Sequence, residues 1–298
     1  MSYADRLTEA MRTKRSPILL GLDPRVELIP DDCFSKGKSD LEGIALGFEN
    51  FAFRLMDALA PHVAAIKPQI AFYEAYGLPG MQAYVNILKR ARELDLISIA
   101  DIKRGDIGST AEAYAQAHLG GPEFGPFEAD AVTINPWLGS DSLEPFFQRC
   151  QQREKGVYLL LHTSNSGSKD LQECDLKEGS QLYQHLATLI DQWQAKWTPD
   201  GEYSSIGVVV GATYPEQLVE LKAQLPRAPF LVPGYGSQGG KGEDVASLYG
   251  EDWTPHLINA SRSLTFAYLK RETSLEEGAL QAAQEMKQDI LNSTNLSF

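Results

Sequence analysis

The chain has 298 residues, of which 43% are hydrophobic and 22% are charged, a balance typical of a globular protein. Its formal net charge of −13 disfavours nucleic acids and anionic membranes as partners, because both carry charge of the same sign. No run is long and apolar enough to predict a membrane span, no signal peptide is recognisable, and the dispersed cysteines Cys33, Cys150 and Cys174 predict reduced thiols in a cytoplasmic enzyme.

Short apolar runs recur along the chain, each followed by polar or glycine-rich residues. Eight of them are candidate strands: Pro17–Asp23, Val63–Gln69, Ile97–Lys103, Ala131–Pro136, Val157–Thr163, Ile206–Gly211, Phe230–Gly236 and Leu257–Ser263. Helical patterns lie between several of them, at Gly43–Leu59, Gly80–Leu94, Gln181–Trp197 and Tyr214–Gln224. Because strands that alternate with helices pair in parallel, eight units favour a closed (β/α)8 (TIM) barrel over an open sheet. We predict one such domain over residues 1–298, with Ser274–Ile290 as a terminal packing helix.

Polar and charged side chains gather at the C-terminal ends of these runs. They are Asp23, Lys67, Asp101, Lys103, Asn135, Thr163, Gln238 and Arg262. Active sites of (β/α)8 barrels lie at that face, on the strand ends and the loops that follow them. We therefore expect the functional site there, with the longer segments 24–39 and 164–179 on the same rim.

Residues 97–110 (ISIADIKRGDIGST) place several charges directly after a buried strand. Strand alternation predicts that Asp101 and Lys103 share a face, where buried charges need partners. With Lys67 from the preceding strand and Asp106, they would form an array of two cations and two anions. Such fixed charges stabilise a developing charge, and an ammonium can protonate a carbanion. A solvated loop is the simpler alternative, which the same-face spacing and the glycines of this stretch disfavour.

The stretch Gly234–Gly240 (GYGSQGG) spells the GxGxxG pattern of dinucleotide-binding proteins. Its context does not fit that use, because it follows the seventh strand and no helix begins promptly after it. In a barrel, the loops after strands seven and eight are the usual phosphate site. We interpret this loop, with Gln238 and Gly239, as a phosphate-binding or lid loop closed by Arg262, whose planar fork suits phosphate. A rim salt bridge is the alternative role for Arg262.

Other catalytic motifs are not recognisable in the sequence. The histidines lack HxH or HExxH spacing, which argues against a metal site, and no GxSxG motif is present. Residues 163–166 (TSNS) offer hydroxyl and amide groups to a polar ring, although ordinary turn chemistry also explains them.

The pattern Asp101-x-Lys103-x-x-Asp106-Ile-Gly-x-Thr110, with Lys67 on the preceding strand, resembles orotidine 5′-phosphate decarboxylases, in particular their longer bacterial subgroup (type 2). Further matches are Gly21-Leu-Asp23, Thr133–Pro136, Thr163–Asn165, Pro233–Gly240 and Arg262. The resemblance spans all eight predicted strands. It implies a cytoplasmic homodimeric barrel, free of cofactor and metal, that converts orotidine 5′-phosphate (OMP) to UMP in the last step of de novo pyrimidine biosynthesis.

The resemblance also implies residue roles at the reacting carbon. Lys103 would protonate C6 of the product carbanion, and Asp101 would lie beside the departing carboxylate. Lys67 and Asp23 would hold the ribose hydroxyls and the charge network.

Further from that carbon, Asp106 and Thr110 would cross the dimer interface into the partner's site. Ser164 would contact the pyrimidine ring. Gln238, in its glycine-rich loop, and Arg262 would bind the phosphate and close the lid.

Three other readings compete with this one. Magnesium-dependent barrels with the same Asp-x-Lys-x-x-Asp motif, such as hexulose-phosphate synthases, place a glutamate ligand at the end of strand two, where this chain has Lys67, a cation that would repel Mg²⁺. A catalytically silent nucleotide-binding barrel would be expected to lack a member of the charged set. A NAD-dependent enzyme rests only on the glycine-rich stretch.

Overall fold

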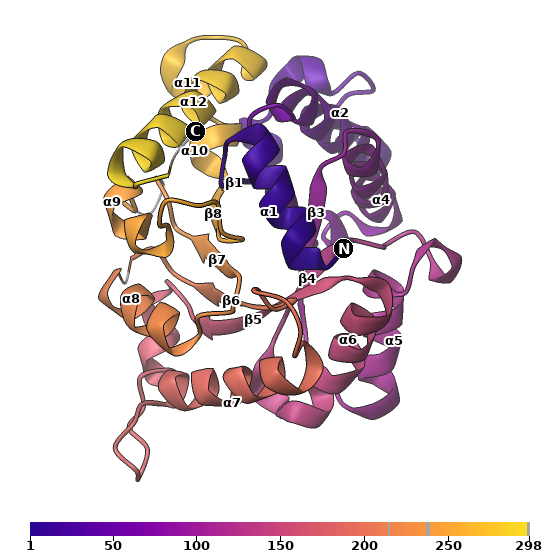
Figure 1. Cartoon of the computed structure of the whole chain (residues 1–298). Coiled ribbons are helices and arrows are strands. Elements are labelled where there is room, and N and C mark those ends of the chain that lie inside the picture. Colours follow the sequence, from indigo (N-terminus) through magenta and orange to yellow (C-terminus); the bar gives the residue numbers. More distant parts are fainter. Residues whose placement is uncertain (214, 237–238, 297–298) are drawn as a thin grey trace.

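Eight parallel strands close into a barrel in chain order in the computed structural model, which describes residues 1–213, 215–236 and 239–296 (Figure 1). The strands are β1 (Ile18–Leu22), β2 (Ala65–Pro68), β3 (Ile97–Arg104), β4 (Ala131–Ile134), β5 (Gly156–His162), β6 (Ile206–Val210), β7 (Phe230–Pro233) and β8 (Leu257–Ala260). Each strand pairs with the next, and β8 pairs with β1 to complete the ring. The predicted (β/α)8 barrel is therefore confirmed.

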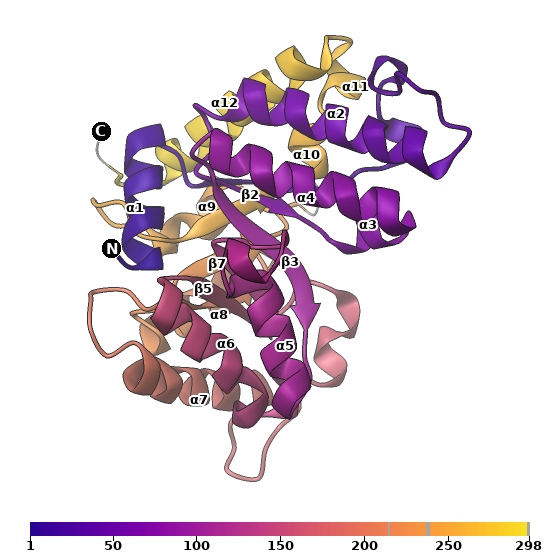
Figure 2. The same ribbon diagram turned by 90° about the vertical axis from the view of Figure 1, so that its right-hand side faces the viewer.

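Helices surround the barrel and separate the strands (Figure 2). They are α1 (Tyr3–Lys14), α2 (Leu41–Leu59), α3 (Ala71–Glu74), α4 (Gly77–Glu93), α5 (Gly108–Leu119), α6 (Ser140–Arg153), α7 (Leu182–Trp197), α8 (Pro215–Gln224), α9 (Gly242–Val245), α10 (Arg262–Thr265), α11 (Tyr268–Arg271) and α12 (Leu275–Ser293). The helical patterns in the sequence correspond to α2, α4, α7, α8 and α12. Within the described part of the chain, no helix has the length and hydrophobicity needed to cross a membrane.

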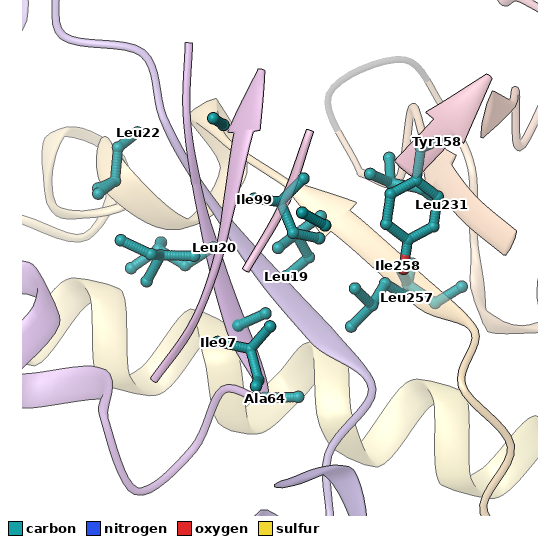
Figure 3. Packing of buried hydrophobic residues seen from close by; sticks show 14 of the residues in the cluster. Leu19, Leu20, Leu22, Ala64, Ile97, Ile99, Tyr158, Leu231, Leu257 and Ile258 are labelled. Atoms are coloured by element: carbon teal, nitrogen blue, oxygen red, sulfur yellow. The ribbon is translucent and has the colours of Figure 1, made fainter. Parts of the chain in front are cut away.

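The strands are buried on both faces because helices cover the outside and side chains fill the inside. All five residues of β1 and all five of β6 are buried. Figure 3 shows side chains of this core, among them Leu19 of β1, Ile99 of β3, Tyr158 of β5 and Leu231 of β7. These continuous apolar runs are the signal by which the strands are recognisable in the sequence.

Helix α1 closes the end of the barrel at which the strands begin (Figures 1 and 2). The hydroxyls of Tyr3 and Tyr158 lie 3.1 Å apart inside the barrel. Gly156, the first residue of β5, has no space for a larger residue, because an added Cβ would stand 2.4 Å from the Tyr3 ring. The segment before α2 lies on the side of the molecule opposite α1 (Figure 2).

Candidate active site

A buried carboxylate lies between two lysines at the C-terminal ends of β2 and β3. Lys67 Nζ donates to Asp101 Oδ2 at 2.6 Å, and Lys103 Nζ donates to Asp101 Oδ1 at 2.5 Å. Asp101 is 4% exposed and Lys67 is 6% exposed. Each carboxylate oxygen therefore has its own cation, which fixes the carboxylate in position.

Thr133 of β4 completes this arrangement. Its hydroxyl donates to Asp101 Oδ1 at 2.8 Å and accepts from the backbone N–H of Lys103 at 3.2 Å. Three neighbouring strands, β2, β3 and β4, thus supply the contacts of one carboxylate. Groups held on strands of a barrel move little when charge develops nearby, as electrostatic catalysis requires.

The charged states of Asp101 and Lys67 depend on one another. Burial raises the pKa of Asp101, but the adjacent Lys67 and Lys103 outweigh it and hold that pKa well below its usual range. Burial lowers the pKa of Lys67, and the opposite charges of Asp101 and Asp23 more than offset it, so that the pKa is raised. Both groups are therefore ionised at neutral pH.

Lys103 reaches Asp101 through an irregular backbone. Its φ of 45° lies in the left-handed region, and the register between β3 and β4 shifts between Ala100 and Arg104. A non-glycine residue in that region carries strain of about 1–3 kcal/mol. The side chains of Asp101 and Lys103 are in contact, as predicted. The prediction assumed regular strand alternation, however, and the backbone here is irregular. The Lys103 side chain remains 44% exposed, whereas that of Asp101 is 6% exposed.

A cavity of about 330 Å³ opens beside the charged residues at the strand ends. It is lined by Asp23, Arg25, Lys67, Gln69, Phe72, Asp101, Pro233, Gly234, Tyr235, Asn259, Ser261 and Arg262. Four of the predicted site residues, from β1, β2, β3 and β8 or just after them, thus share one cavity. Two buried acceptors in it, Asp23 Oδ1 and Asn259 Oδ1, have no hydrogen-bond partner within the described residues. Unpaired buried acceptors at a cavity wall are suited to a ligand that brings hydroxyl groups.

Arg25, Gln69 and Asn259 line the cavity but are not among the site residues predicted from the sequence. Arg25 lies two residues after Asp23, Gln69 two residues after Lys67, and Asn259 lies within β8. Their proximity to the predicted strand ends is the sequence feature that could have identified them.

Asp106 does not join the charged array within one chain. Its Oδ1 accepts from the N–H of Ile107 at 2.8 Å, and it forms no ion pair with any described residue. The sequence suggests an array of four charges, but within one chain the array has three members, Lys67, Asp101 and Lys103. Asp106 follows the end of β3, and its carboxylate accepts a hydrogen bond from the next residue instead. Thr110, on α5, is exposed, and neither residue lines the cavity.

The remaining predicted residues lie in loops. Ser164 follows β5 and packs against Gly211 after β6, where an added Cβ would be 2.8 Å from Ser164 Cβ, and Ser164 does not line the cavity. Gly239 has a φ of 95°, and its N–H donates to the carbonyl of Gly236 at 3.1 Å. Gln238 lies outside the described residues.

The glycine-rich loop after β7 is anchored to the C-terminal helix. The N–H of Gly236 donates to the carbonyl of Gly240 at 2.8 Å, which closes the loop on itself. Asp289 of α12 accepts from the Tyr235 hydroxyl at 2.6 Å and from the Gly242 N–H at 2.7 Å. The helix that follows, α9, has four residues, unlike the long helix of a dinucleotide-binding unit.

A second, larger cavity of about 610 Å³ lies between α7 and the segment 135–140 that follows β4. Its lining includes Trp137, Leu186 and Trp193 and contains no charged side chain.

Within the described residues, no group of three or more histidine, cysteine, aspartate or glutamate side chains is placed to hold a metal ion. The charged cavity is therefore the candidate active site.

Comparison with known proteins gives one consistent family. The sequence profile of the orotidine 5′-phosphate decarboxylase / HUMPS family matches residues 17–277. A protein of Rhodopirellula baltica named orotidine 5′-phosphate decarboxylase is 40% identical over 280 residues, which cover 92% of each chain. One of the same name from Clostridium acetobutylicum is 40% identical over 289 residues, 96% of this chain and 98% of that one. The structure of Leishmania donovani OMP decarboxylase superposes with a TM-score of 0.76 at 30% identity, covering 98% of both chains.

The substitution Asp101→Asn tests the interdependence of these charges. It should lower the free energy of unfolding by about 3–5 kcal/mol at pH 7, because it leaves Lys67 buried without its carboxylate. Since the pKa of Asp101 is lower in the folded than in the unfolded protein, its stabilising contribution is present above the unfolded-state pKa of about 3.9 and is lost as the pH falls below it. The stability difference should therefore shrink below about pH 4.

Urea unfolding followed by tryptophan fluorescence, from pH 7 to pH 3, measures this difference. Asp191→Asn, on the exposed face of α7, is the matched control and should change stability by less than about 0.5 kcal/mol. An Asp101→Asn variant as stable as the wild type at pH 7 would show that the buried charge of Lys67 does not depend on Asp101.

Proposed function

The chain belongs to the orotidine 5′-phosphate decarboxylase / HUMPS family, and we propose that it catalyses the decarboxylation of OMP to UMP in pyrimidine biosynthesis. The observation that carries the proposal is the buried Lys67–Asp101–Lys103 array beside a cavity of ligand size. Relatives that align over more than nine-tenths of this chain bear the decarboxylase name. We also propose that the enzyme works in the cytoplasm.

Decarboxylation breaks the bond between C6 and the carboxylate carbon, so that CO2 leaves and an electron pair remains at C6. The orotate ring offers no π system to delocalise that pair, and stabilisation must come from fixed charge beside it. The Lys103 ammonium, already 2.5 Å from Asp101, would supply that charge and then the proton. Asp101 would lie beside the substrate carboxylate, and the repulsion between the two anions would end when CO2 departs.

The rest of the substrate would lie along the charged cavity. Asp23, whose buried Oδ1 has no hydrogen-bond partner among the described residues, would accept a hydrogen bond from a ribose hydroxyl, with Lys67 beside it. Arg262 and the glycine-rich loop with Gln238 and Gly239 would bind the phosphate, and binding energy far from C6 would hold the ring in position. Ser164 would contact the pyrimidine.

We propose no metal or cofactor for this reaction. Lys67 occupies the end of β2, where magnesium-dependent barrels with the same motif are expected to carry a glutamate ligand. Its ammonium is ion-paired with Asp101 and close enough to Asp23 to be stabilised by it. A divalent cation at this position would be repelled by the lysine and would compete with it for those carboxylates.

A homodimer would complete the site. Asp106 has no ion-pair partner within the described residues of its own chain, and Thr110 is exposed on the same segment. Ile107, which lies between them in the sequence, is 56% exposed. Trp137 is 65% exposed and lies two residues after Asn135, whose N–H donates to the carbonyl of Arg104. Exposed apolar side chains beside an unpaired carboxylate suit an interface, so Asp106 and Thr110 would enter the partner's site.

Turnover of OMP, followed as loss of orotate absorbance, tests the proposed reaction. The wild type should be active with and without EDTA, and Lys103→Ala should lower the rate by at least about 10³-fold, because both the fixed charge and the proton donor are removed. Lys196→Ala removes an exposed lysine on α7 and should leave the rate unchanged. Inhibition by EDTA would contradict the metal-free mechanism, and a wild type inactive on OMP would contradict the function.

Mixing two inactive variants tests the shared site. Lys103→Ala and Asp106→Ala should each be inactive alone. In hybrid dimers one site would carry both defects and the other neither, so that random mixing after co-refolding should restore about a quarter of wild-type activity. Activity that stays at the level of the two parents, or an Asp106→Ala variant that is fully active by itself, would show that Asp106 does not serve the partner's site.

A further inference from the structure

Arg25 is a cation of the active-site cavity to which neither the motif nor the comparisons assign a role. It follows β1, two residues after Asp23, and it lines both the charged cavity and an adjoining cavity of about 390 Å³. Phe72 also lines both, and the Arg25 guanidinium lies 5.8 Å from the centre of its ring. The two side chains therefore form part of the wall that the cavities share.

The charge of Arg25 is not neutralised by the described residues. Its Nε is buried without a hydrogen-bond partner, and the side chain forms no ion pair with a described carboxylate. Other partly buried arginines are paired: Arg54 with Glu276 and Asp32, and Arg104 with Glu74. A buried N–H of a cation without an acceptor is costly, unless a ligand supplies the acceptor.

Arg25 shares its cavity with the arginine to which the sequence assigns phosphate binding. It shares the charged cavity with Arg262, which follows β8, the strand that pairs with β1 through Leu20 and Ala260. Lys67 and Lys103, which pair with Asp101, belong to β2 and β3. Two arginines that have no carboxylate partner among the described residues thus line the cavity that Lys67 and Asp101 also line.

We propose that Arg25 is a second phosphate-binding residue, which acts with Arg262 on the 5′-phosphate; this inference rests on the proposed function. The planar guanidinium offers several N–H donors to phosphate oxygens, and a dianion accommodates two such cations. Stacking on Phe72 of α3 orients the guanidinium before the ligand arrives, which reduces the entropy lost on binding. Binding of phosphate would then link the loop after β1 to α3.

The test compares UMP with uridine, which lacks the phosphate, in NMR titrations of the full-length protein. Arg25→Gln should weaken UMP binding by about 10-fold to 100-fold and leave uridine binding unchanged. Arg25→Lys, which keeps the charge but not the planar fork, should lose less. The control is Arg149→Gln: Arg149 also lies over an aromatic ring, 5.6 Å from the centre of Phe124, but does not line the cavity. It should bind both ligands as the wild type does.

Each outcome decides the inference separately from the proposed function. Equal losses for UMP and uridine, or no loss for either, in a folded Arg25→Gln protein would overturn it, and the thermal unfolding midpoint establishes folding. If Arg25→Gln does not fold, Arg25→Lys decides: an unchanged ratio of UMP to uridine affinity would overturn the inference. A wild type that turns over OMP while Arg25→Gln binds UMP normally refutes only the role of Arg25, whereas a wild type inactive on OMP refutes the function first.

Discussion

The carboxylate of Asp101 is the group on which the rest of this site depends. It is almost fully buried, and it is stable there as an anion only because Lys67, Lys103 and Thr133 surround it. Lys67 in turn keeps its charge in a buried position because Asp101 and Asp23 are near. Removal of any one charge therefore alters the cost of the others, and the array acts as a unit.

The barrel provides the rigidity that this unit needs. Helix α1 and the Tyr3–Tyr158 contact close one end, the interior is filled with apolar side chains, and the Lys67–Asp101–Lys103 array lies at the opposite end. The strained backbone at Lys103 is held between β2 and β4, where a shift in register accommodates it. A strained residue that the surrounding strands hold in place is common at functional sites, where it directs a side chain that regular geometry would not.

Much of this arrangement could be predicted from the sequence because buried parallel strands are continuous apolar runs with polar ends. The sequence patterns do not predict α1, α5 or α6. Helix α1 is largely polar, α5 buries mainly alanines such as Ala111 and Ala115, and α6 has Pro145 in its interior. The left-handed backbone conformation of Lys103 cannot be predicted from the sequence either, because lysine has no preference for that conformation. Arg25 and Asn259 line the same cavity, and this cannot be predicted from the sequence because it depends on how the loops fold over the strand ends.

In the proposed reaction, fixed charge at Lys103 stabilises an electron pair at C6 of the nucleotide. By microscopic reversibility, the same charge should promote removal of the C6 proton from the product. Exchange of that proton for deuterium, followed by NMR of UMP in D2O with the protein present, measures this step without decarboxylation. We expect exchange with the wild type and none above the uncatalysed rate with Lys103→Ala. No exchange with a wild type that turns over OMP, or equal exchange with both proteins, would contradict it.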